Sequence, residues 1–154
     1  MNKKDLQKII NYIIKKTLKL KDKYTQEKEI EIDYICIFSQ RDKEYRDLKD
    51  IVSEIGELVW DSPTGPVYKL KVRPQTPAGK PVLLRIRIPD KTRLERGDVD
   101  FNTDYPKFKN KYLKDSHFKL IEREDYEMIE LMDIDFDVRV YFSSTSFSKT
   151  LRAS

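Results

Sequence analysis

The sequence predicts an α+β protein made of two successive βαβββ units that follow an N-terminal helix. Three observations favour this fold class: a helical pattern in residues 1–24, a strand–helix–strand–strand–strand order in residues 32–88, and the same order in residues 97–143. Two copies of one supersecondary unit can cover each other's open edges. We therefore expect one compact domain with a ligand cleft between the units.

Residues 1–24 predict an amphipathic helix. Its apolar residues recur at spacings of three and four, with lysines between them, and are Leu6, Ile9, Ile10, Ile13, Ile14 and Leu18. We expect this stripe to pack on the flank of the domain. A basic amphipathic helix can also bind a membrane surface or a partner, which leaves assembly into a homo-oligomer open.

In the first unit, residues 34–38 predict a strand and residues 43–55 a helix, and further strands are expected at 57–60, 66–72 and 82–88. The apolar stripe of the helix consists of Tyr45, Leu48, Ile51, Val52 and Ile55. Asp42 precedes this helix and is the expected N-cap.

In the second unit, strands are expected at residues 98–101, 118–122, 126–131 and 137–142, with a helix at 106–113. Asp104 is its expected N-cap, because Pro106 suits the first helical turn. Residues 144–154 are rich in Ser and Thr and predict a mobile tail in which Phe147 and Leu151 dock only weakly.

Strict alternation in the strands separates two faces of the predicted sheet. Residues 84, 86 and 88 are apolar, as are 138, 140 and 142, so these positions should face the helices. The opposite, concave face would then carry Tyr34, Arg85, Arg87, Asp98, Asp100, Arg139 and Tyr141. We predict that these seven residues bind a ligand. The linker between the units, residues 89–96, could overhang the cleft and add charge.

Composition excludes several classes of function. The chain has 31 basic and 27 acidic residues, and this mixture of signs disfavours a nucleic-acid partner. Cys36 is the single cysteine, so no disulfide forms within one molecule. No secretory signal or apolar run long enough to span a bilayer is present. A soluble, cytoplasmic protein is expected.

The order of elements resembles the vicinal-oxygen-chelate superfamily, which includes glyoxalase I, extradiol dioxygenases and antibiotic-resistance proteins. Within it, the chain looks most like small bacterial members that also begin with an extra helix. The resemblance rests on residues 33–37, 65–70, 84–89 and 97–101, and it extends over residues 32–143.

In metal-dependent members of that superfamily, the ligands are His, Gln or Glu side chains on the first and last strands of each unit. The matching positions here are Tyr34, Arg85 or Arg87, Asp98 or Asp100, and Arg139 or Tyr141. Arginine is always cationic and has no lone pair for a metal. The resemblance therefore implies the fold without the usual metal site.

Three functions are open on this basis, and whether the chain is an enzyme is undecided. The first is binding of a small anionic ligand, a carboxylate or a phosphate, by Arg85, Arg87 and Arg139 without a cofactor. The alternative is a metal-dependent lyase, isomerase or dioxygenase that holds a divalent metal at Asp98 or Asp100. The third is an interaction protein that assembles through its N-terminal helix.

The same strands also allow other interpretations. The arginines and aspartates of the concave face could simply neutralise one another as buried pairs. Asp98 and Asp100, with Asp137, could hold two Mg²⁺ ions, although the Gly-Ser turn of such enzymes is absent. His117 has no second His or Cys nearby in the sequence, so we expect a surface residue.

Overall fold

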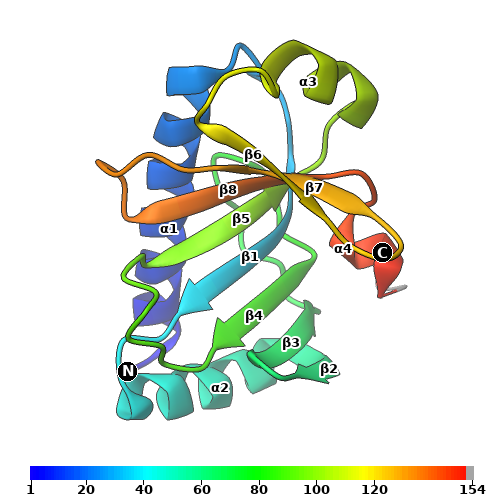
Figure 1. Ribbon diagram of the computed structural model, residues 1–154. Coiled ribbons are helices and arrows are strands. Elements are labelled where there is room, and N and C mark those ends of the chain that lie inside the picture. Colours follow the sequence, from blue (N-terminus) through cyan, green and yellow to red (C-terminus); the bar gives the residue numbers. More distant parts are fainter. Residues whose placement is uncertain (152–154) are drawn as a thin grey trace.

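A computed structural model describes residues 1–151 and shows an α+β fold in which helices cover an eight-stranded sheet (Figure 1). The elements are α1 (Lys3–Tyr24), β1 (Ile32–Phe38), α2 (Asp42–Ile55), β2 (Gly56–Ser62), β3 (Gly65–Leu70), β4 (Leu83–Arg87), β5 (Gly97–Phe101), α3 (Tyr105–Tyr112), β6 (Phe118–Glu122), β7 (Glu127–Leu131), β8 (Val138–Ser143) and α4 (Phe147–Thr150). Each predicted strand and helix up to residue 143 is present, with ends that differ by at most two residues.

The strands are ordered β2-β3-β4-β1-β5-β8-β7-β6 across the sheet. β1 and β5 pair antiparallel at its centre. β1 is parallel to β4, and β5 is parallel to β8. The outer strands of each half pair antiparallel. Both halves therefore place their first and last strands at the centre of the sheet, where side chains from all four share one surface.

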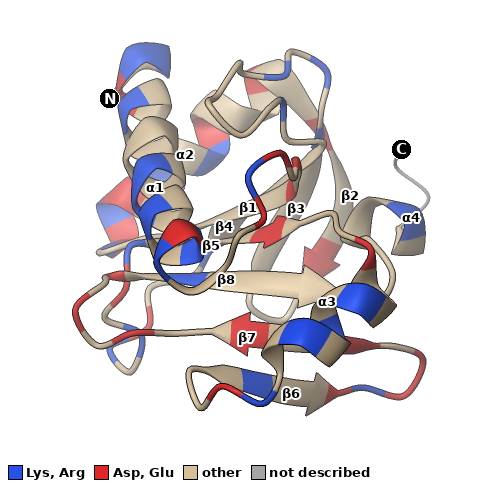
Figure 2. Cartoon of the chain, turned by 90° about the horizontal axis from the view of Figure 1, so that it is seen from above, with Lys and Arg blue, Asp and Glu red and all other residues tan. Residues whose placement is uncertain are grey.

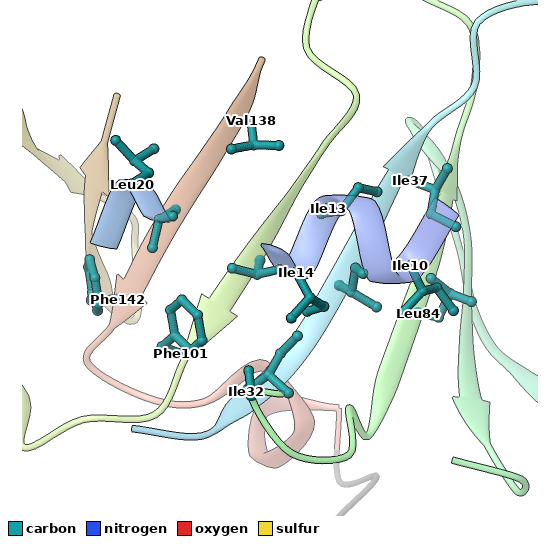
Figure 3. Packing of buried hydrophobic residues seen from close by; sticks show 14 of the residues in the cluster. Ile10, Ile13, Ile14, Leu20, Ile32, Ile37, Leu84, Phe101, Val138 and Phe142 are labelled. Atoms are coloured by element: carbon teal, nitrogen blue, oxygen red, sulfur yellow. The ribbon is translucent and has the colours of Figure 1, made fainter. Parts of the chain in front are cut away.

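Helix α1 packs along the central strands β1, β5 and β8. It begins with a capping box between Asn2 and Asp5. The predicted apolar stripe points into the core, where Ile13 and Ile14 are fully buried against the sheet (Figure 3). Helix and sheet approach closely at Gly97, because a Cβ there would lie 2.7 Å from Ile13 Cδ1.

The predicted N-caps of α2 and α3 have different outcomes. Asp104 caps α3 and accepts a hydrogen bond from the backbone N–H of Lys107 at 3.5 Å. Asp42 is not the N-cap of α2, because the helix begins one residue earlier than expected and Arg41 occupies that position without a side-chain bond. Asp42 instead lies in the first turn, where its negative charge interacts favourably with the helix dipole and stabilises the helix.

The prediction of a mobile tail is wrong for residues 144–151, and its last three residues lie outside the described chain. Helix α4 docks on β1, and Ser148 is only 2% exposed. Asp33, at a β-bulge in β1, accepts hydrogen bonds from the Ser148 N–H at 3.0 Å and its hydroxyl at 2.5 Å. A buried carboxylate needs such donors, so Asp33 anchors a segment of low hydrophobicity.

We predict that Ser148→Ala lowers the free energy of unfolding by about 1.5–3 kcal/mol, because one hydrogen bond to a buried charged group is lost. Chemical denaturation measures this, and amide exchange should show faster opening of α4. Ser146→Ala is the matched control, since the Ser146 side chain makes no capping bond. Equal stability of the two variants would show that α4 is not held by this contact.

Acidic and basic residues are distributed over the whole molecule. Figure 2 shows Lys and Arg on α1 and α3, and Asp and Glu on β7 and in several loops. Within residues 1–151, no helix has the length and apolar character needed to cross a membrane.

Candidate functional site

A cavity of about 630 Å³ opens on the sheet face opposite α1. Side chains of β4, β1, β5 and β8 form its floor, and its walls come from the β2–β3 hairpin, β6, β7 and the C-terminal segment. A volume of this size is typical of sites for small molecules.

Cross-strand pairing sets which side chains share the floor. One row runs Arg85–Cys36–Asp98–Arg139 across β4, β1, β5 and β8. The adjacent row on the same face runs Tyr34–Asp100–Tyr141–Glu130. The alternation in the sequence thus predicted correctly which side chains of β4, β1, β5 and β8 lie on the face opposite α1.

Six of the seven predicted site residues line this cavity: Tyr34, Arg85, Arg87, Asp98, Asp100 and Tyr141. Arg93 of the linker also lines it, as expected for a loop that overhangs the cleft. Arg139 is the exception and is not among the lining residues.

Arg139 forms ion pairs with two glutamates and does not reach the cavity lining. Its Nε donates to Glu95 Oε1 at 2.6 Å and its Nη1 to Glu130 Oε2 at 3.4 Å. Tyr141 also donates its hydroxyl to Glu130 Oε2, at 2.7 Å. Burial is the largest single effect and lowers the pKa of Arg139, but the hydrogen bonds and charges of Glu95 and Tyr141 together outweigh it and raise that pKa. The predicted pairing of Arg139 with the aspartates is therefore wrong, because Arg139 forms its ion pairs with the two glutamates.

Arg85 lies inside a group of aromatic rings. Its Cζ is 5.5 Å from the ring centroids of Trp60 and Phe147 and 5.7 Å from that of Tyr34. Its Nε is buried and has no hydrogen-bond partner within the described chain. No carboxylate among residues 1–151 lies within salt-bridge distance of this guanidinium. Arg85 thus has cation–π contacts, while its buried Nε donor has no acceptor within the described residues.

Arg87 has a similar environment one step along β4. Its Cζ lies 5.5 Å from the ring centroid of Phe38, and its Nε is also buried without a partner in the described part of the protein. Asp90 is its acidic neighbour, 3.6 Å away. Two arginines on one strand therefore present underused donors to the same cavity.

Asp98 and Asp100 are buried in the floor, 8% and 5% exposed. Burial raises the pKa of Asp98 to about 7, although the charges of Arg85 and Arg87 oppose the increase. Burial also raises the pKa of Asp100 well above its ordinary value, despite a hydrogen bond at 2.5 Å from the Ser143 hydroxyl. Both carboxyl groups favour their neutral form more than ordinary aspartates do.

The sequence did not reveal the walls of the cavity. Trp60 on β2 and Phe147 on α4 lie far apart in the sequence, and Met128 lies on β7. In the sequence, nothing distinguishes these residues from ordinary strand or tail residues. Their contribution depends on how the edge strands curve over the floor, for which the sequence contains no signal.

The described residues contain no group of three or more His, Cys, Asp or Glu side chains that could hold a metal ion. The predicted set of Asp98, Asp100 and Asp137 is not assembled, because Asp137 lies outside the cavity lining and accepts a hydrogen bond from the Tyr12 hydroxyl at 2.6 Å. His117 is partly exposed and contacts Asp115, as expected for a surface residue.

Among solved structures, the chain is similar to a structural-genomics protein named EC4020. The two share 11% sequence identity with a TM-score of 0.72, and the match covers 97% of this chain and 92% of that protein. At such low identity, the likeness shows the fold alone. No family model and no curated protein matches the chain.

Proposed function

We propose that this chain is a two-unit protein of the vicinal-oxygen-chelate type that binds a small anionic ligand in its cavity without the usual metal site. The strand order supports the two-unit part, because each half reads strand, helix and three strands, and in each half the first strand is parallel to the last. The cavity supports the binding part, since it lies over the four strands that carry ligands in the family the sequence resembles.

The proposal rests mainly on the guanidinium of Arg85, which lies at the cavity without an ion-pair partner in the described chain. A guanidinium offers five N–H donors in a planar fork that suits carboxylate and phosphate groups. The Arg85 fork lies at the cavity without an acidic partner in residues 1–151, and its Nε is unsatisfied. Buried donors without acceptors are costly, so an anion that fills this position gains a strong interaction.

The charges around the cavity favour an anion. Arg139, which Glu130 shares with Glu95, offsets part of the charge of Glu130, and Glu130 also accepts the Tyr141 hydroxyl. The raised pKa values of Asp98 and Asp100 reduce the negative charge of the floor near neutral pH. The arginines that line the cavity are always protonated. A positive surplus at neutral and mildly acidic pH therefore attracts an anionic group.

Calorimetry of the purified protein at pH 6 tests this proposal with phosphate and succinate as probes. We expect measurable binding that weakens at least tenfold in Arg85→Gln, because the guanidinium is removed. Trp60, the single tryptophan, lies in the cavity wall and provides a fluorescence signal for the same titration. Arg46→Gln, at an exposed position of α2, is the control and should bind like the wild type.

Binding that is equal in Arg85→Gln and the wild type would overturn the proposal. Metal analysis of the same preparation addresses the alternative of a metal-dependent lyase, isomerase or dioxygenase. One transition-metal ion per chain, lost in Asp98→Asn or Asp100→Asn, would favour that alternative over anion binding.

A further inference from the structure

We propose that the ligand is a monocarboxylate with a flat apolar body, whose carboxylate contacts Arg85 and whose body lies between the β2–β3 hairpin and β7. This inference deepens the proposed function and rests on it. It follows from the division of the cavity into a polar floor and an apolar wall.

The apolar wall is contributed by elements at both edges of the sheet and by the C-terminal segment. Its members are Val59, Trp60, Pro63, Ile121, Met128 and Leu151. Trp60 is 42% exposed, and large apolar side chains at the mouth of a cavity lose water when a ligand covers them. An inorganic anion would leave this wall solvated and would fill little of the 630 Å³.

The floor favours one flat negative group over a bulkier dianion. Arg85 and Asp98 lie in the same cross-strand row with Cys36 between them. Two strand spacings separate their backbones by about 10 Å, which leaves room for a carboxylate between the two side chains. One edge of that carboxylate can accept from Arg85 in the bidentate manner, and the other can accept from the protonated carboxyl of Asp98.

A dianionic phosphate would fit this floor less well. Its additional negative oxygens would approach Glu130, which lines the same cavity and shares the cation of Arg139 with Glu95. Like charges at short distance in a poorly solvated site repel strongly. The aromatic rings around Arg85 add a second preference, since Trp60 and Phe147 present apolar surface directly beside the anion-binding group.

Calorimetric titrations at pH 6 with four probes test this inference: 2-naphthoate, acetate, 2-naphthamide and phosphate. We expect 2-naphthoate to bind at least tenfold more tightly than acetate and than phosphate. The neutral amide should bind at least tenfold more weakly than the acid. Trp60→Ala should weaken naphthoate binding at least fivefold and acetate binding much less, because Trp60 is only one of the rings around Arg85. Leu94→Ala, 85% exposed outside the cavity, should change neither.

The outcomes separate the two proposals. If phosphate or acetate binds as tightly as naphthoate through Arg85, anion binding is retained and the apolar ligand class is overturned. If naphthamide binds as tightly as naphthoate, or no carboxylate or phosphate binds, the proposed function itself fails. Met128→Ala tests the opposite wall of the cavity and keeps the inference testable if Trp60→Ala fails to fold. An unchanged naphthoate affinity in Met128→Ala would contradict the placement of the apolar body between the hairpin and β7.

Discussion

Replacing Arg139 with Ala is expected to lower the free energy of unfolding by about 3–5 kcal/mol. The side chains of Arg139, Glu95 and Glu130 are only 15%, 13% and 10% exposed, so solvent screens them little. Removing the guanidinium leaves two carboxylates without their cation in a poorly solvated region. Urea denaturation at pH 7 measures the loss directly.

Arg85→Ala is the informative comparison, because Arg85 lies in the same cross-strand row as Arg139 but has no ion-pair partner in the described chain. It has no acidic partner in the described chain, so its removal leaves no carboxylate unpaired. We expect a much smaller loss of stability and a clear loss of anion binding. Unchanged stability of Arg139→Ala, together with weakened binding of phosphate or a carboxylate, would instead place Arg139 among the ligand-binding residues.

The contrast between the two arginines shows what the sequence could predict. Alternation in Leu83–Arg87 and Val138–Ser143 determines the face on which each side chain lies, because the period of a strand is two. The apolar stripes of α1 and α2 likewise define their buried sides. The face of the sheet on which a cavity forms follows from these local patterns alone.

The partners of those side chains depend on contacts that are distant in the sequence. Glu95 reaches Arg139 from a loop 44 residues earlier, and Asp33 holds Ser148 from 115 residues away. Nothing in the local pattern of Glu95 distinguishes it from a surface residue. The ordered tail was missed for the same reason, since α4 docks through the buried carboxylate of Asp33 and through packing of Phe147 on Tyr34, both distant in the sequence.

Asp98→Asn is expected to stabilise the protein by about 2–4 kcal/mol at pH 8 and to leave its stability nearly unchanged at pH 4. Burial raises the pKa of Asp98 from 3.8 to about 7, so ionising this carboxyl is costly in the folded protein. A shift of this size corresponds to about 4 kcal/mol. Asparagine keeps the shape of the neutral carboxyl and cannot ionise, so the variant avoids this cost.

The direction of the pH dependence follows from proton binding. Between about pH 4 and pH 7, the folded protein keeps the Asp98 proton and the unfolded chain has lost it, so the contribution of Asp98 to the stability of the wild type falls as pH rises and then levels above pH 7. Urea denaturation at pH 4, 6 and 8 should show a smaller decline for Asp98→Asn. Asp135→Asn, an exposed aspartate in the β7–β8 loop, is the control and should follow the wild-type curve. If Asp98→Asn instead destabilises the protein at pH 8, the ionised carboxylate compensates the arginines of the floor, and the cavity then has less positive charge to offer an anion.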